Sequence, residues 1–159
     1  MLQLTKRTEY GLLALVHLVD RQGAISVREI CERYPLPRRT VAEVLKDLQH
    51  AGVVESQRGS SGGYSLARSP ELITLGHVVA ALEGAPPLTT CESPIVLKHG
   101  GCEVQPMCPI KSPIHRVREH LWQMLEHTTL RSLVAAAPLV ATPPFTPVAA
   151  SPTAAQAHR

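Results

Sequence analysis

Three of the four cysteines of this chain lie within one short stretch, "CESPIVLKHGGCEVQPMC", as Cys91, Cys102 and Cys108. Cysteine thiolates are soft ligands, so their natural partners are iron–sulfur clusters, zinc and copper(I). The spacing C-x10-C-x5-C contains neither the closely spaced cysteine pairs of zinc sites nor the C-x2-C runs of ferredoxins. Spacing alone therefore leaves three interpretations open: a metal or cluster site, a redox thiol switch, or inert cysteines.

The cellular compartment expected from the sequence favours some of these interpretations of the cysteines over others. The chain has no membrane-spanning run of about 18 apolar residues and its start lacks a secretory signal, so we expect a cytoplasmic protein with no membrane partner. Cytoplasmic thiols stay reduced, which favours metal binding or redox chemistry over structural disulfides. The fourth cysteine, Cys31, follows Ile30 in "EICER" and is predicted to be a buried structural thiol.

The elements that must position these cysteines are predicted to be mainly helical. Aromatic residues make up only 3% of the chain, and strands prefer aromatic and β-branched residues. Apolar spacing predicts a helix over 8–20, a second from its cap Ser26 to Tyr34, and a third from Pro37 to Gly52. The buried stripe of this third helix is predicted to be Val41, Val44, Leu45 and Leu48. "VVES" and "YSLA", joined by "QRGSSGG", predict a β-hairpin.

The second half of the chain contains a helix that suits a partner. A fourth helix is predicted from Leu75 to Leu82, closed by Gly84, and a fifth begins near Pro113, after the cysteine segment. "TTLRSLVAA" predicts a short last helix. The apolar residues of the fifth helix repeat in heptad fashion, which suits packing on another helix; they are Ile114, Val117, Leu121 and Met124.

We therefore predict a mainly α protein with a winged helix-turn-helix domain followed by a long dimerisation helix. Residues 1–84 form the winged helix-turn-helix domain, 85–112 the cysteine-bearing loop, and 113–137 the dimerisation helix with a short closing helix. Residues 138–159 contain five Pro and six Ala, with one charged side chain at the very end. Such a segment cannot bury enough surface to offset its ordering entropy, so it is predicted to be disordered.

Three features of the first half point to DNA. All of the formal excess charge of +3 lies in residues 1–70, which is a weak hint of a polyanionic partner. The third helix begins with Arg38, Arg39 and Thr40, where a recognition helix meets base edges and phosphates. The wing carries Arg58 beside Gly62 and Gly63, which let a loop approach a DNA backbone closely. A basic helix start or a glycine-rich turn alone is common, but their conjunction favours DNA binding.

These segments resemble one family of bacterial transcriptional regulators. "LTKRTEYGLLALVHL", "REICERYPLPRRTVAEVLKDLQHAGVVESQRGSSGGYSLA" and "ITLGHVVAALEG" are similar to the Rrf2 family over about residues 2–135. The resemblance implies a homodimer that binds double-stranded DNA at a palindromic operator, with Arg39, Thr40 and Arg58 at the contacting helix start and wing. Ala42 stands where the iron–sulfur biogenesis regulator of the family has a glutamate that helps choose operators, so operator preference does not carry over.

The same resemblance implies that Cys91, Cys102 and Cys108 hold a [2Fe–2S] or [4Fe–4S] cluster with a fourth ligand that is not cysteine. The gap between the first two cysteines is longer than the common one. Lys111 occupies the place of the histidine ligand of the iron–sulfur biogenesis regulator, and a charged lysine is a poor ligand. Glu9 matches the carboxylate that the nitric-oxide-sensing branch donates from the partner subunit. His99 and His115 remain further candidates.

The leading hypothesis is thus a dimeric transcription factor that senses redox, nitric oxide or iron–sulfur status through its cluster. The alternative is a metal-free thiol switch on the same fold. A metal-dependent enzyme or a metal-storage module is a third class. The sequence shows no carboxylate pair, nucleophile–base pair or phosphate-binding loop, so we do not expect an enzyme.

Overall fold

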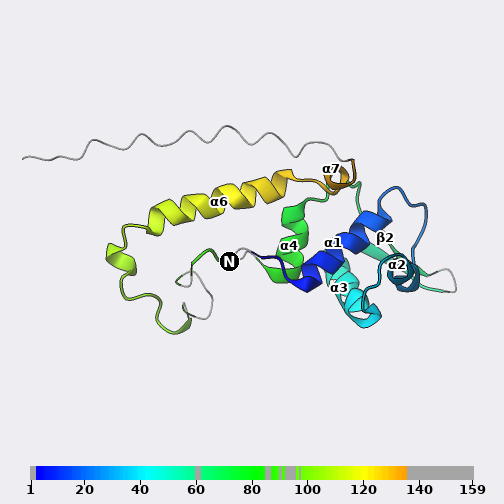
Figure 1. The fold of residues 1–159 in the computed structure, drawn as a ribbon, viewed down its shortest axis with the longest axis horizontal. Helices are drawn as coiled ribbons and strands as arrows, with labels where there is room; N and C mark the ends of the chain where they lie inside the picture. Colours follow the sequence, from blue (N-terminus) through cyan, green and yellow to red (C-terminus); the bar gives the residue numbers. More distant parts are fainter. Residues whose placement is uncertain are drawn as a thin grey trace, which may run out of the picture.

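The computed structural model describes residues 3–59, 62–84, 87–89, 91, 96 and 98–135. The tail predicted for 138–159 lies outside these residues, as does the very tip of the wing. Described helices and strands follow the order expected from the sequence (Figure 1). They are α1 (Lys6–Leu18), α2 (Val27–Arg33), α3 (Arg38–His50), β1 (Val54–Gln57), β2 (Gly63–Leu66), α4 (Leu75–Glu83), the 3-10 helix η2 (Gln105–Met107), α6 (Lys111–His127) and α7 (Leu130–Val134).

Hydroxyl side chains determine where four of the helices begin. Thr5, Ser26, Thr74 and Thr129 precede α1, α2, α4 and α7, and each accepts a hydrogen bond from a backbone N–H in the first turn. Such caps satisfy a donor that would otherwise have no partner inside the helix. The predicted cap at Ser26 is confirmed, because its Oγ accepts from the Glu29 N–H at 3.2 Å.

The first four helices and the hairpin enclose one aliphatic core. The predicted stripe of α3 is confirmed: Val41, Val44, Leu45 and Leu48 are each at most 1% exposed. They pack with Leu15 of α1, Ile30 of α2 and other aliphatic residues. Leu130 of α7 lies in the same core, so the end of the long second half folds back onto the winged-helix domain.

The wing is a two-stranded antiparallel sheet in which Val54 pairs with Leu66 and Gln57 with Gly63. A bridge between Ile25 and Tyr64 adds a short third partner, with hydrogen bonds of 2.9 and 2.8 Å in the two directions. The fold is therefore a winged helix-turn-helix, as predicted. No helix among the described residues is long and apolar enough to cross a lipid bilayer.

Helix α6 carries the chain from the cysteine segment back to this domain (Figure 1). It begins at Lys111, two residues before the predicted start, and has 17 residues, or about 25 Å of rise. Pro113 is still tolerated because the N–H groups of the first turn have no partner within the helix. The cysteine segment lies beyond the far end of α6 from the winged helix (Figure 1).

The end of α6 is joined firmly to the domain. The Leu75 N–H donates to the Thr128 carbonyl at 2.8 Å, and the Leu130 N–H donates to the Ile73 carbonyl at 2.7 Å. Gly76 of α4 faces Glu126 so closely that an added Cβ would lie 2.9 Å from Glu126 Cγ. Backbone hydrogen bonds and close packing therefore tie the C-terminal end of α6 to α4.

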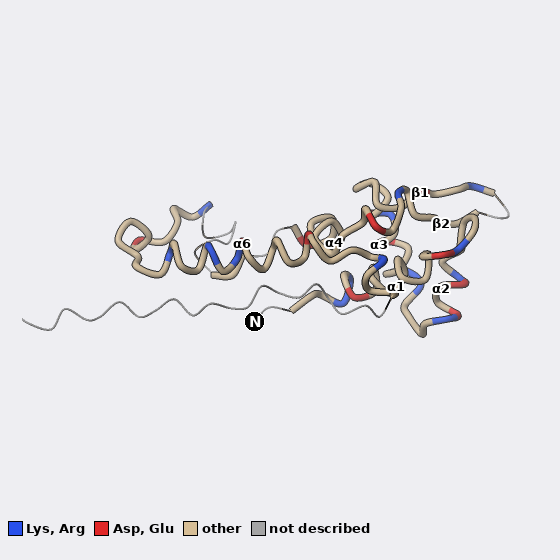
Figure 2. Tube along the Cα trace, turned by 90° about the horizontal axis from the view of Figure 1, so that it is seen from above, with Lys and Arg blue, Asp and Glu red and all other residues tan. Residues whose placement is uncertain are grey.

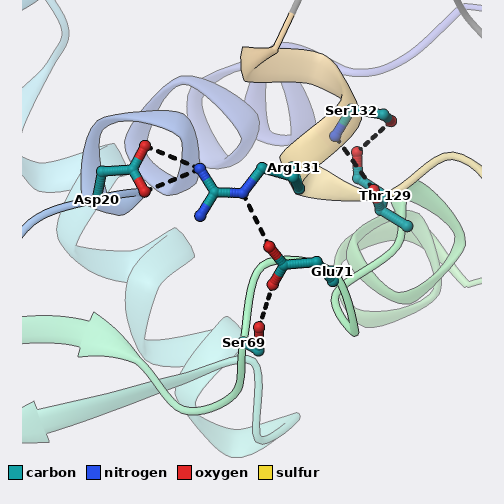
Figure 3. A network of polar contacts seen from close by, with 6 residues as sticks. All are labelled: Asp20, Ser69, Glu71, Thr129, Arg131 and Ser132. Atoms are coloured by element: carbon teal, nitrogen blue, oxygen red, sulfur yellow. Dashed lines mark hydrogen bonds and ion pairs between the residues drawn. The ribbon is translucent and has the colours of Figure 1, made fainter. Parts of the chain in front are cut away.

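Arg131 adds a polar clamp at the same junction (Figure 3). Its guanidinium reaches Asp20, just after α1, at 2.8 Å and Glu71, before α4, at 3.0 Å. Ser69 donates a hydrogen bond to the other Glu71 oxygen. One arginine of α7 thus connects three segments that are distant in sequence.

Candidate functional site

Cys91, Cys102 and Cys108 line one pocket with a volume of about 730 Å³ at the N-terminal end of α6. All three are half-buried free thiols. Other residues on its wall include Gln105, Lys111, His115, Arg116 and Arg118. The structure therefore brings the three sequence-predicted cysteines to one place, although 16 residues lie between the first and the last.

Tight turns place two of these cysteines. Gly100 and Gly101 both have positive φ, at +96° and +81°, a conformation that glycine adopts without steric cost. Cys102 follows, and its carbonyl accepts from the Gln105 N–H at 2.9 Å as η2 begins. Cys108 ends η2, and its carbonyl accepts from the Lys111 N–H at 3.4 Å where α6 begins. The "GGC" and "PMCP" sequences thus turn the chain around the pocket.

Cys91 lines the pocket from the start of the cysteine segment. Its Sγ lies 3.1 Å from Thr89 Oγ1. Within the part of the chain that the structure describes, no three His, Cys, Asp or Glu side chains converge closely enough to hold a single metal ion. A cluster differs from a single ion, because its irons are spread out and its ligands need not meet at one point. Three soft thiols around one pocket are therefore a suitable donor set for a cluster.

The charge around the pocket is positive. Lys111, Arg116 and Arg118 all line it, and α6 begins at Lys111 on the pocket wall. Oriented N–H groups at a helix start carry a partial positive charge. A thiolate-ligated cluster is anionic, so this surrounding suits it.

The predicted fourth ligands lie in different places. Glu9 is in the first turn of α1, where it pairs with Lys6 Nζ at 2.6 Å. Among the residues described, the lining of the pocket includes His115 but neither Glu9 nor His99. Glu9 is therefore not among the described residues that line the pocket of its own chain.

Cys31 is apart from this group. It lies in α2, is half-buried and packs against the core. Burial raises the pKa of the Cys31 thiol, and the nearby Arg38 guanidinium offsets part of that rise. Cys31 packs against the core, as expected of a structural thiol. Its side chain is only half-buried, whereas a buried one was predicted.

The residues predicted to meet DNA lie on exposed elements of the winged helix. Arg38 and Arg39 are exposed at the start of α3, and Thr40 is half-buried. Arg39 Nε lies 3.1 Å from Glu43 Oε1, yet its side chain is 93% exposed. Arg58 is exposed just after β1, where the wing leaves the sheet. Helix start and wing thus both present cations to solvent (Figure 2).

The two wing glycines have a second role that sequence reasoning missed. An added Cβ on Gly62 would lie 2.6 Å from the Gln57 carbonyl oxygen, and one on Gly63 would collide with the backbone of Ile25. Both glycines are therefore required by packing within the chain, independently of DNA. The close approach to Gly63 comes from the pairing of Ile25 with the wing. Local sequence patterns do not reveal this pairing, because the two segments are distant in the chain.

Sequence reasoning also missed the basic wall of the pocket. Arg118 follows Lys111 by seven residues, and His115 follows it by four, which places all three along one side of a helix. Helical spacing from Lys111 could have found them.

An exposed recognition helix, a wing and a separate thiol pocket at the end of a long helix define a winged-helix transcriptional regulator. The chain matches the Rrf2 family, described as an iron-dependent transcriptional regulator, over residues 4–136. The chain belongs to the Rrf2 family.

Solved structures agree with this assignment. CymR, described as the global cysteine regulator of B. subtilis, is 28% identical and superposes with a TM-score of 0.67 over 87% of this chain and 100% of its own. The oxidized form of Staphylococcus aureus CymR is 27% identical, with a TM-score of 0.62 over 84% and 96% of the two chains. T. potens IscR is 25% identical, with a TM-score of 0.62 over 89% and 93%.

Proposed function

We propose that this transcriptional regulator works as a homodimer, binds a palindromic operator in double-stranded DNA, and responds to redox, nitric oxide or iron–sulfur status. Its sensor is a [2Fe–2S] or [4Fe–4S] cluster held by Cys91, Cys102 and Cys108. The observation that carries this proposal is the meeting of the three cysteines in one positively charged pocket. The iron dependence in the description of the family supports it.

The cysteines would hold the cluster, and the cationic wall would stabilise its negative charge. When bound, the cluster supplies a group whose ligation and oxidation state respond to oxidants, nitric oxide and iron supply. Lys111, Arg116 and Arg118 would also favour the entry of anions over cations into the pocket. Glu9 from the partner subunit is the fourth ligand that the family resemblance suggests.

Helix α6 is the element that would transmit a change in the pocket. Cys108 lies three residues before its start, and Thr128, just beyond its end, is bonded to α4 of the winged helix. A rigid helix fixed at one end converts a small shift at the other into a movement of the subunits. For regulation, the cluster must interact differently with the two arrangements.

The remaining parts of the proposal assign roles along the chain. Residues 1–84 read DNA through Arg38, Arg39, Thr40 and the wing residues Arg58, Gly62 and Gly63. Residues 85–112 hold the cluster, 113–137 join two subunits, and 138–159 form a tail. A dimer of winged helices suits a palindrome because protein and operator then share a two-fold axis.

Anaerobic reconstitution tests the cluster directly. The full chain should take up iron and sulfide, become coloured, and lose operator affinity or gain it when nitric oxide or air is added. Cys102→Ala should take up much less iron, whereas Cys31→Ala, outside the pocket, serves as the matched control. Wild-type protein that binds no iron or sulfide, and behaves like Cys102→Ala, would contradict the proposal.

A metal-free thiol switch is the second candidate. Its support is that the same three free thiols share a pocket without converging on one point in the described residues. The similarity to an oxidized form of CymR is consistent with it. Colourless protein whose operator affinity changes on oxidation and recovers with a dithiol reductant would favour this candidate over the cluster.

A further inference from the structure

Three thiolates leave one position of a cluster to be filled, and the structure offers a nitrogen for it. His115 lies on α6 one helical turn beyond Lys111, so both side chains project from the same side of the helix. Both line the pocket together with the three cysteines. The position of the lost histidine ligand is thus taken up by an imidazole one turn later.

The contacts of His115 define which ring nitrogen carries the proton. Its Nδ1 lies 3.2 Å from an Arg118 guanidinium nitrogen, and its Nε2 lies 3.1 Å from Glu119 Oε1. A guanidinium only donates, so Nδ1 must accept and present its lone pair. Nε2 then carries the hydrogen and donates it to the Glu119 carboxylate.

The same contacts show which way the ring faces. Arg118, the partner of Nδ1, lines the pocket, whereas Glu119, the partner of Nε2, is not among the described lining residues. Nδ1 is therefore the ring nitrogen that lies beside a residue of the pocket wall. Metal-binding histidines commonly donate their other ring N–H to a carboxylate, which orients the ring and raises its basicity. His115 already has that arrangement.

We propose that His115 Nδ1 is the fourth ligand of the cluster, with Glu119 as the residue that positions it. This inference rests on the proposed function. Arg118 would have to give up its contact with Nδ1, and its long side chain allows this without moving the helix. The ligand would then come from the same chain as the three cysteines, in place of Glu9 from the partner subunit.

Pulsed electron paramagnetic resonance of the reduced, reconstituted full chain tests the assignment. Wild-type protein should show one strongly coupled nitrogen, whose signal changes when the histidines are labelled with ¹⁵N. His115→Ala should lose this coupling. His120→Ala, on the same helix but absent from the described pocket wall, should retain it, as should Glu9→Ala.

Replacing His115 by cysteine, which offers a thiolate at the same position, provides a second test of the assignment. His115→Cys should keep its cluster, lose the nitrogen coupling, and have a more negative reduction potential because thiolate donates more charge than imidazole. Glu119→Gln should keep the coupling but shift the potential, as expected for a positioning residue.

The outcomes separate the two proposals. A cluster without a strongly coupled nitrogen, or a coupling that survives His115→Ala, would overturn the assignment of His115 and leave the cluster proposal standing. A chain that takes up no iron or sulfide at all would overturn both.

Discussion

Gly63 illustrates how a single residue can satisfy two demands at once. Its backbone pairs with Gln57 in the wing, while its missing side chain leaves room for the Ile25 backbone. Gly63→Ala should therefore force the wing and the Ile25 segment apart and lower the free energy of unfolding by about 1–3 kcal/mol, the usual range for overpacking. Chemical denaturation measures the change.

Ser65→Ala, two residues along the same strand, is the matched control for Gly63→Ala. Its hydroxyl donates to the exposed Glu55 carboxylate, so little stability should be lost. If Gly63→Ala were as stable as this control, the close approach to Ile25 would not be required.

Residue-level predictions succeeded where local chemistry decides the outcome. Ser26 caps α2, and the α3 stripe is buried, because both follow from short-range spacing. The dual role of Gly63 depends on segments that meet only after folding, whereas the basic side chains around Arg118 follow from the spacing of one helix. Assignment of the cysteines to one site came from the family resemblance, since their spacing fits no common motif.

Among the elements, the short helix α7 affects the stability of the fold through the ion pair between its Arg131 and Glu71. The Ser69 hydroxyl, the Glu71 N–H and Arg131 lower the pKa of the Glu71 carboxyl to about 2 from an ordinary value of 4.5. A depressed pKa in the folded state means that the ionised form contributes stability. That contribution is complete above about pH 4.5 and is lost as the pH falls towards 2.

We therefore expect Glu71→Gln to flatten the loss of thermal stability between pH 4.5 and 2 relative to the wild-type chain. Arg131→Met should flatten it only in part, because Ser69 and the backbone N–H remain. Added salt should reduce the difference, since Glu71 is exposed to solvent. Melting curves recorded across this pH range provide the measurement, and parallel curves for all three proteins would contradict the expectation.

Element boundaries followed the sequence closely wherever a cap marks them. The start of α6 was the exception, because Lys111 has no side-chain cap before it and Pro113 suggested a later beginning. The attachment of α6 to α4 could not be predicted, since Gly76 carries no local sign that Glu126 lies against it. Such contacts depend on tertiary packing and not on helix propensity.

At the scale of the whole molecule, the separation of the two sites makes DNA binding testable on its own. If Arg39 and Arg58 each neutralise one phosphate per subunit, replacing either by Ala removes two contacts from the dimer and should reduce the slope of log affinity against log salt concentration by about 1.8, at about 0.9 per phosphate. Lys98→Ala, in the cysteine segment, is the control and should leave the slope unchanged. Fluorescence anisotropy with operator DNA at several salt concentrations gives the slopes. Equal slopes for all four proteins would place the DNA contacts elsewhere.

The exposed apolar face of α6 is the surface through which we expect two subunits to form a dimer. None of its side chains is buried, and the heptad residues Val117 and Met124 are 49% and 47% exposed. Such an apolar stripe on a long helix suits a second copy of the chain. Val117→Glu combined with Met124→Glu should therefore yield a monomer in sedimentation experiments. The monomer should stay folded, because the described core contains no residue of α6.

Gln123→Glu adds a charge to α6 away from the stripe and should remain dimeric. The monomeric variant should also bind a palindromic operator far more weakly than a wild-type dimer, because two linked domains bind with a high effective concentration. Its affinity for a single half-site should change little. A double variant that stays dimeric would show that the subunits meet through another surface, and the route from the cysteine pocket to DNA would then have to bypass α6.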